Sequence, residues 1–410
     1  MSKKKIRLFE KKENCCGCGT CMLVCPRQAI KMTESELGCL YPVIDHEQCV
    51  GCEKCKQVCA YQNVTDKEIE EIPTMAAMAE DFKLLSNSAS GGVFAVIAEN
   101  ILEQGGVVYG CSLECENKKL VPRHIEIEKK EELYKLQGSK YVQSFLGDIF
   151  QSVKEKTEKK IPVLFSGTPC QIDALTRYLE KEDMSSLYTI DIICHGVPSA
   201  KLFGEYLETI EKKKHRRISE FYFRDKTWGW GLNGKYILID ANGKAEVENF
   251  PADISSYYSF FLESEIYRQS CYSCKYATSS RRGDITIGDY WCLEKEHPEY
   301  TKEKGGVLSV ADGVSCVLVN TMQGEKLVTS FSKGLRYEKS EFSKVAKWNR
   351  QLIGPSKHTE KRNEILTAYE KYGYKGIERL YQRKLGIKYY IRLLRNRRKQ
   401  CRKSKGANIF

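Results

Sequence analysis

The sequence has neither a long hydrophobic run nor a secretory signal. Its longest apolar stretch, Gly91 to Leu102, is interrupted by Glu99 and Asn100 and is shorter than the 18 or so residues that a membrane span needs. The first seven residues carry four positive charges and lead into no apolar signal core. The chain has nineteen cysteines but no secretory signal, and free thiols persist only in a reducing compartment. The sequence therefore predicts a cytoplasmic protein rather than a secreted disulfide scaffold.

Most of the chain also carries no excess of positive charge. The net charge is +12, but the segment from Arg383 to Lys405 alone contains eleven Lys or Arg and no acid. The remainder is nearly neutral, so nucleic acid is not an expected partner. In the helix predicted for this tail, Ile387, Tyr390, Ile391 and Leu394 share one face, as in helices that lie on anionic membranes. The tail is therefore either a peripheral membrane contact at the inner face of the membrane or a solvated terminal helix.

Cysteine is abundant, and eight of the nineteen cysteines form a repeated pattern. Each run reads C-x-x-C-x-x-C-x-x-x-C, and the runs begin 34 residues apart. Two-residue spacers let three cysteines of one loop reach the same cubane, and in two-cluster ferredoxins the fourth ligates the other cluster. The pattern predicts two 4Fe-4S clusters, one held by Cys15, Cys18, Cys21 and Cys59 and the other by Cys49, Cys52, Cys55 and Cys25. Cys16 and Cys39 lie outside the pattern and are interpreted as small buried apolar residues.

At 410 residues the chain is too long for a ferredoxin module alone, and its composition is that of a globular protein with a sizeable core. An acidic connector, Thr65 to Ile72, precedes Pro73. Further on, helical segments alternate with apolar runs such as Ile161 to Phe165 and Leu187 to Ile193, which are typical of buried parallel strands. We expect a ferredoxin-type domain over 1–64, an α/β core in two parts over 75–150 and 151–325, and a helical, basic extension over 326–410.

The turns after these two strands carry further candidate residues. Cys170 ends the first turn and Cys194 begins the second, at the strand ends where open α/β sheets place ligands. With Cys271 and Cys274 they could form a four-thiolate site for a third cubane or for zinc; the alternative for Cys170 and Cys194 is a buried free thiol. His195 is more typical of a hydrogen-bonding turn residue than of a proton donor.

Two glycine-containing segments precede or follow predicted helices. Ser90, Gly91 and Gly92 lead into a helix that starts at Val93, which suits either an anion site or an ordinary helix cap. The turn 138–141 presents a lysine and a tyrosine.

Six short motifs occur in the order in which they stand in one known family. They are Ser90-Gly-Gly-Val-Phe94, Gly138-Ser-Lys-Tyr-Val-Gln143, Gly167-Thr-Pro-Cys-Gln171, Cys194-His-Gly-Val-Pro-Ser199, Cys271-Tyr-Ser-Cys274 and Asp284-Ile-Thr-Ile-Gly-Asp289. From about residue 75 to 320 the sequence resembles the beta-subunit family of coenzyme F420 hydrogenases and dehydrogenases, here preceded by a ferredoxin pair.

The resemblance implies an α/β flavoprotein core with bound FAD, a nearby 4Fe-4S cluster, and reduction or oxidation of a second substrate at the flavin. It strengthens the third-cluster assignment to Cys170, Cys194, Cys271 and Cys274, of which Cys170 is the weakest. The candidate cofactor-binding residues are Ser90, Gly91, Gly92, Gly138, Ser139, Lys140, Tyr141, Gly167, Thr168 and Asp289. Members of the family differ in their substrate, so neither the substrate nor a catalytic residue follows from the resemblance.

These parts together predict an iron-sulfur flavoenzyme that passes electrons between a ferredoxin-like module and FAD and acts on an organic substrate. A redox protein such as ferredoxin would be its donor or acceptor. One alternative is an electron-transfer subunit that relays electrons to a partner enzyme without a substrate of its own, and another is a scaffold that has lost the flavin. The loop Lys226 to Gly234 bears on this choice, because its two tryptophans could cover a planar substrate.

Overall fold

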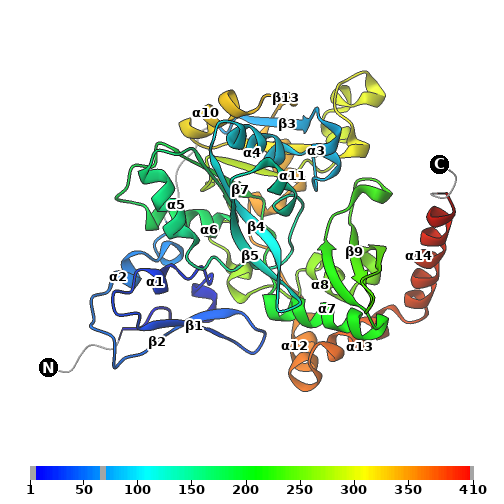
Figure 1. Ribbon diagram of the computed structural model, residues 1–410, viewed down its shortest axis with the longest axis horizontal. Coiled ribbons are helices and arrows are strands. Elements are labelled where there is room, and N and C mark those ends of the chain that lie inside the picture. The colour runs from blue at the N-terminus through cyan, green and yellow to red at the C-terminus, as the bar shows by residue number, and fades with distance from the viewer. Residues whose placement is uncertain (1–5, 65–70, 407–410) are drawn as a thin grey trace.

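The computed structural model describes residues 6–64 and 71–406, which fold into three β-sheets surrounded by helices (Figure 1). The N-terminal module, blue in Figure 1, contains an antiparallel strand pair and two short helices. These are β1 (Ile30–Glu34), β2 (Leu40–Ile44), α1 (Thr20–Leu23) and α2 (Lys54–Gln57). Each helix begins after a residue with left-handed backbone, Gly19 before α1 and Glu53 before α2, so the two cysteine runs adopt the same local turn.

An eight-stranded sheet forms the centre of the core. Its strand order is β13-β3-β12-β11-β7-β6-β4-β5, in which β11, β7, β6 and β4 run parallel and the other neighbours pair antiparallel. The strands are β3 (Thr74–Ala79), β4 (Val107–Glu116), β5 (Lys119–Ile127), β6 (Val163–Gly167), β7 (Leu187–Ile192), β11 (Ile285–Asp289), β12 (Ser315–Val319) and β13 (Leu335–Ser340). Val163, Leu164 and Phe165 of β6 are fully buried, as the unbroken apolar run predicted. The expected mixed α/β core behind a ferredoxin-like module is confirmed.

Helices cover both faces of this sheet. On one face, α4 (Val93–Glu103) and α10 (Met322–Phe331) pack against Leu164 and Ile190. On the other, α5 (Ile149–Glu158) and α6 (Pro169–Tyr178) pack against Val163 and Phe165. The module docks beside α6, as Figure 1 shows, so its cysteine loops lie near the carboxyl ends of β6 and β7.

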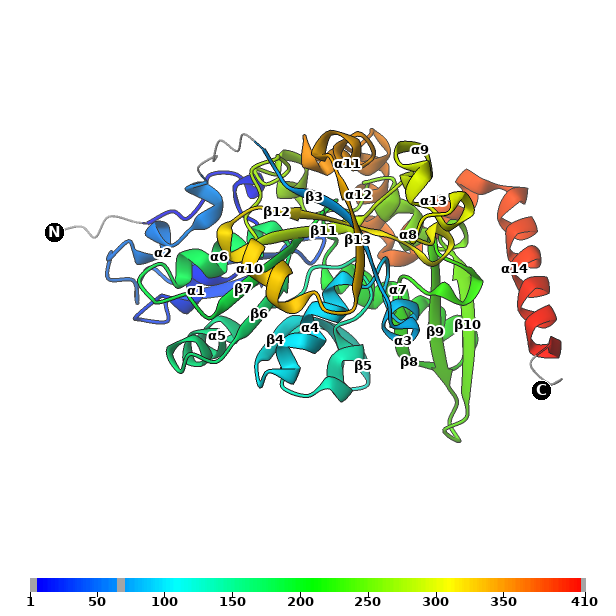
Figure 2. The same ribbon diagram turned by 90° about the horizontal axis from the view of Figure 1, so that it is seen from above.

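A smaller antiparallel sheet and the C-terminal helices form the other end of the molecule (Figure 2). The sheet comprises β8 (Arg217–Tyr222), β9 (Asn233–Ile239) and β10 (Ala245–Pro251). An aromatic core joins it to α7 (Ala200–Lys214), α8 (Ser256–Leu262), α12 (Lys361–Tyr372) and α13 (Tyr374–Leu385). The last helix, α14 (Ile387–Gly406), contacts β10 and lies at the opposite end of the molecule from the module.

The start of the helical extension differs from the expectation. Helix α10 crosses the expected boundary at residue 326, and β13 then returns to pair with β3 along the edge of the main sheet. The continuous helical region begins only at α11 (Phe342–Trp348). Strand β13 is a charged edge strand without a continuous apolar side, so its sequence carries little strand signal. The remaining short helices are α3 (Phe82–Ser86) and α9 (Leu293–Glu296).

Candidate electron-transfer site

The cysteines of the repeated pattern gather at two places in the module. Burial raises the pKa of Cys59, and the nearby Cys18 thiol adds to the rise. Burial likewise raises the pKa of Cys55, with the thiols of Cys52 and Cys25 adding to it. The fourth cysteine of each run therefore lies with the other run, which is the exchange that two-cluster ferredoxins use. We name Cys15, Cys18, Cys21 and Cys59 the proximal site and Cys25, Cys49, Cys52 and Cys55 the distal site.

The local backbone suits metal-sulfur clusters at both places. Gly17 and Gly51 occupy the same position in the two runs and both have left-handed backbone, at φ of +72° and +77°. The distal site reaches the surface, where Cys52 is exposed, whereas Cys18 and Cys59 of the proximal site pack against the core. All the described cysteines are free thiols, so none of these side chains is used up in a disulfide.

Four cysteines of the core form a third group. Cys170 and Cys194 follow the adjacent parallel strands β6 and β7, so both stand at the same edge of the sheet. The segment that carries Cys271 and Cys274 joins them, because the Arg268 N–H donates to Val197 O at 2.8 Å beside Cys194. Burial raises the pKa of Cys271 strongly, and the thiols of Cys194, Cys274 and Cys170 add to this rise. The structure thus brings together the four cysteines that the sequence grouped.

Two kinds of metal site suit four thiolates. A tetrahedral zinc site holds four donors at about 2.0–2.3 Å from one ion, whereas a cubane takes one cysteine at each of four irons. Among residues 6–64 and 71–406, the ferredoxin cysteines included, no three His, Cys, Asp or Glu side chains are placed to hold a metal ion.

Cys16 connects the proximal site with the core group, and the sequence reasoning missed this role. The side chain is buried, as expected, and it packs with both Cys18 and Cys170 in one cluster of side chains. Hydrogen bonding from Cys16 lowers the pKa of Cys18 to about 6 and also lowers the pKa of Cys170. No spacing rule singles out Cys16, because its position depends on how the module docks. A series of sulfur contacts therefore runs from the module into the core.

A fully buried ion pair fixes the segments that bear the core cysteines. Asp191, at the end of β7, accepts a hydrogen bond from Arg281 Nη2 at 2.9 Å, and its side chain has no exposed surface. Arg281 also donates to Ile192 O and to Tyr276 O, both at 2.9 Å. Ile192 precedes Cys194 by two residues and Tyr276 follows Cys274 by two, so this pair holds the two cysteine-bearing segments together.

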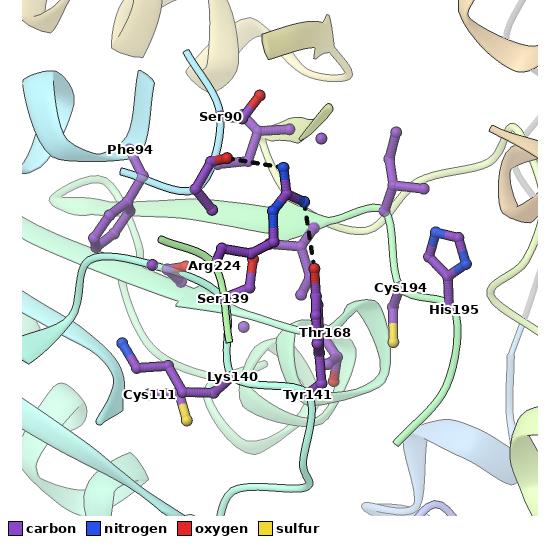
Figure 3. Close-up of a pocket in the computed structure, with 18 of the residues that line it drawn as sticks. Ser90, Phe94, Cys111, Ser139, Lys140, Tyr141, Thr168, Cys194, His195 and Arg224 are labelled. Carbon is purple, nitrogen blue, oxygen red and sulfur yellow. Dashed lines mark hydrogen bonds between the residues drawn. The ribbon is translucent and has the colours of Figure 1, made fainter. Parts of the chain in front are cut away.

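A cavity of about 390 Å³ lies at the carboxyl ends of the parallel strands (Figure 3). Cys170 and Cys194 line it, so it borders the core cysteine group. Of the predicted cofactor-binding residues, it is lined by Ser90, Gly92, Gly138, Ser139, Lys140, Tyr141, Gly167, Thr168 and Asp289. Gly91 does not line it: the Gly91 N–H donates to Ser315 Oγ at 2.9 Å, and a Cβ there would lie 2.3 Å from Ala77 O. Gly91 is a packing glycine.

Arg224 crosses one wall of the cavity and was not among the predicted residues. Its guanidinium pairs with Asp289 at 2.9 Å and donates to Ala89 O at 3.0 Å and to the Tyr141 hydroxyl at 3.4 Å (Figure 3). It also lies 5.7 Å from the ring centre of Trp291. The Asp289 carboxylate is therefore neutralised by Arg224 and faces the cavity as part of an ion pair.

Lys140 is a second buried cation at the cavity. Its Nζ donates to Lys135 O at 2.9 Å and Gln137 O at 2.8 Å, and no carboxylate among the described residues pairs with it. Burial lowers the pKa of Lys140 to about 8, an effect that the nearby Cys111 thiol partly offsets. An unpaired cation at a cavity wall favours an anionic ligand.

The two histidines of the cavity are neutral near pH 7. Burial lowers the pKa of His124 to about 4, and its ring is held by Ser166 O at 3.0 Å and Ser144 Oγ at 2.8 Å. Burial also lowers the pKa of His195, whose ring and the Cys194 sulfur point in different directions in Figure 3.

The two tryptophans of the 226–234 loop do not act as one cover. Trp230 packs against Trp291 with ring centres 4.8 Å apart, whereas Trp228 lies under Lys399 of α14, 4.1 Å from its Nζ. Trp291 is the tryptophan that lines the cavity.

Two family models match this chain. Residues 162–345 match the C terminus of the coenzyme F420 hydrogenase/dehydrogenase beta subunit, and residues 14–63 match a 4Fe-4S dicluster domain. The matches relate this chain to iron-sulfur electron-transfer proteins of the oxidoreductase type. The predicted resemblance is confirmed: residues 162–345 resemble the F420 hydrogenase/dehydrogenase beta subunit, and residues 14–63 resemble a dicluster domain that stands in front of it.

A curated relative is an uncharacterised protein of Methanocaldococcus jannaschii, 27% identical over 198 residues. The alignment covers 41% of this chain and about half, 54%, of that protein. Among solved structures, a chain of the F420-reducing [NiFe] hydrogenase complex from Methanosarcina barkeri is similar, with 16% identity and a TM-score of 0.42. That match covers 77% of this chain and 91% of the other.

Within residues 6–64 and 71–406, none of the helices combines the length and the apolar character that crossing a bilayer requires.

Proposed function

We propose that this protein is an iron-sulfur flavoenzyme that exchanges electrons with a redox protein through its N-terminal module and with an organic substrate at FAD. The proximal and distal sites would each hold a 4Fe-4S cluster. Cys170, Cys194, Cys271 and Cys274 would hold a third, and the 390 Å³ cavity would hold FAD. FAD supplies the ability to take electrons singly and deliver them in pairs.

The observation that carries this proposal is the sulfur path through Cys16. This thiol packs with Cys18 of the proximal site and with Cys170 of the core group, and Cys170 lines the cavity. The exposed Cys52 marks the outer end of the same path. A route from the surface to the cavity is what a relay between a protein partner and a flavin needs.

The residues of the cavity fit a cofactor that carries phosphate. Helix α4 begins at Val93, and its N-cap residue Gly92 supplies no side-chain cap, so the first N–H groups of the helix remain available to an anion. Lys140 supplies an unpaired positive charge, and Trp291 supplies an aromatic wall for a planar ring. These residues would bind and orient FAD and exclude water from it.

Counting the cofactors tests the proposal. Full-length protein purified without oxygen is expected to contain about twelve irons and one FAD, since each of three cubanes holds four irons. The Cys274→Ser variant is expected to contain about eight irons and to keep the two clusters of the module. About eight irons in the unaltered chain would rule out the third cluster, and colourless protein would rule out the relay.

A turnover assay distinguishes an enzyme with its own substrate from a relay subunit. Protein that binds FAD and is reduced by dithionite or reduced ferredoxin, yet turns over no small molecule, would be an electron-transfer subunit for a partner enzyme.

We also propose that α14 contacts anionic membranes at their surface. Its apolar residues face solvent: Ile387 is 76% exposed and Leu394 is 55% exposed, with Tyr390 and Ile391 also exposed. The opposite side of the helix is held to the protein, where Gln400 Nε2 donates to Asn249 O at 2.8 Å. An exposed apolar stripe with basic flanks is the pattern of a helix that lies in the headgroup region.

Vesicle flotation tests the membrane proposal. The full chain is expected to float with phosphatidylserine-containing vesicles and not with pure phosphatidylcholine vesicles, because the attraction depends on anionic lipid. Replacing Ile387 and Leu394 together by serine, which leaves the charge unchanged, is expected to abolish flotation. Equal recovery of both proteins would rule out insertion of the apolar stripe.

A further inference from the structure

A buried guanidinium lies against the proximal site without a carboxylate partner. Arg268 is 1% exposed and is the largest of the fully buried side chains. Among residues 6–64 and 71–406, no Asp or Glu carboxylate oxygen lies within 4.0 Å of its guanidinium nitrogens. A buried cation without an anion costs several kcal/mol, so a guanidinium that stays buried needs a negative group nearby.

The neighbours of Arg268 identify that group. Its Nε donates to Cys15 O at 2.9 Å, its Nη2 to Leu40 O at 2.8 Å and its Nη1 to Gln143 Oε1 at 3.3 Å. Nη2 also lies 3.8 Å from Cys15 Sγ, and the guanidinium packs over the Tyr41 ring at 4.2 Å. The group that becomes anionic when metal binds is therefore the Cys15 thiolate, a ligand of the proximal site.

The two cysteine runs differ at this point. A Cβ on Gly17 would lie 2.5 Å from Arg268 Nη1, so the glycine of the first run leaves room for the guanidinium. Gly51, the equivalent residue of the second run, has no heavy atom within 4 Å of its Cβ position. A buried cation therefore lies beside the proximal site. The distal site has no such neighbour at Gly51 and reaches solvent at the exposed Cys52.

The difference has an electrostatic consequence. Reduction adds one negative charge to a cluster, and a nearby positive charge in a medium of low dielectric constant stabilises the reduced form. At the distal site, which reaches the surface at Cys52, water and ions screen nearby charges, so these have a much smaller effect.

We infer that Arg268 is a positioning residue of the electron path that raises the reduction potential of the proximal cluster above that of the distal cluster. With both sites loaded, one electron from a reduced redox protein such as ferredoxin would pass from the distal site to the proximal site, with no bond or proton exchanged, and so to the side of Cys170 and the cavity. The inference rests on the cluster assignment proposed above, but it needs neither the flavin nor a substrate. It gives the module a direction: the distal site is the entry point for single electrons.

Redox titration of the full chain, purified without oxygen and followed by electron paramagnetic resonance, tests the inference. In Arg268→Gln, the ratio of reduced to oxidised protein for one cluster is expected to fall at least tenfold at a fixed potential, which is about 59 mV for a one-electron couple. The other clusters are expected to titrate unchanged. Arg268→Lys keeps the charge and is expected to retain most of the original potential.

Two further variants keep the test decisive. Gln143→Glu places a carboxylate beside the guanidinium and is expected to lower the same reduction potential while Arg268 stays in place. This variant keeps the test possible if Arg268→Gln loses its iron. Lys54→Gln removes an exposed charge beside the distal site and is expected to shift no potential.

Unchanged potentials in iron-replete Arg268→Gln and Gln143→Glu, or an equal shift of all clusters, would overturn the inference. A failure of the proposed function would look different, because the unaltered protein would then lack iron or flavin.

Discussion

Replacing Asp191 by alanine is expected to lower the free energy of unfolding by about 3–5 kcal/mol, because the Arg281 guanidinium would remain buried without its partner. Both side chains are at most 1% exposed, and the Asp191 carboxylate also accepts from the backbone N–H groups of Arg282 and Gly283 at 3.0 and 2.9 Å. The loss is measured as the shift of the urea midpoint of the core transition. Because the pair holds the segments of Cys194 and Cys274, the variant is also expected to lose the iron of the core group.

An exposed ion pair provides the matched control. Asp183 pairs with Lys160 at the surface, where their side chains are 60% and 57% exposed. Asp183→Ala is expected to leave the urea midpoint nearly unchanged, since surface pairs contribute little. If Asp191→Ala were as stable as Asp183→Ala and kept about twelve irons, Asp191 would not hold together the two segments that carry the core cysteines.

Replacing Lys140 by methionine is expected to weaken FAD binding roughly 10- to 150-fold, which corresponds to the 1.5–3 kcal/mol of a hydrogen bond to a charged group. Flavin fluorescence during titration of the deflavinated protein measures the dissociation constant. Lys135→Met is the control, because Lys135 pairs with Glu132 at 2.7 Å and its side chain is 31% exposed. An equal effect of both variants would contradict a role for Lys140 in binding.

The same lysine predicts a dependence on pH. Burial lowers the pKa of Lys140 to about 8, and a bound anion raises it again, so binding is tightest below pH 8, where the ammonium is already formed. FAD affinity is expected to fall as the pH rises above 8. The groups that face Lys140 are Cys111 and Glu114 on β4 and His124 on β5. His124, with a pKa of about 4, does not titrate in this range.

Lys140→Arg separates this effect from other titrations. Arginine stays protonated, so its FAD affinity is expected to be constant between pH 7 and 9. An unaltered pH profile in this variant would assign the dependence to another group.

The sequence predicted the elements whose pattern is local. The buried strands β6 and β7 lie within two residues of the predicted apolar runs, because such runs and the glycine turns after them mark strands directly. Strand β13 was missed because a charged edge strand lacks that pattern. The 226–234 loop was interpreted as one aromatic cover, yet its two tryptophans contact partners from distant segments, Trp291 and Lys399.

By itself, the sequence determined that eight cysteines at cluster spacing precede an α/β core. It also determined which turns of that core carry the further cysteines, since spacing and periodicity are properties of neighbouring residues. Tertiary structure alone decided the roles of Cys16, Arg224 and Arg268. Arg268 is 253 residues from Cys15, and Arg224 is 65 from Asp289. Such contacts form only when the module docks and the two sheets meet, and no local pattern encodes them. The physical reason is burial: a cysteine or an arginine acquires its function here from the charges that the fold places beside it.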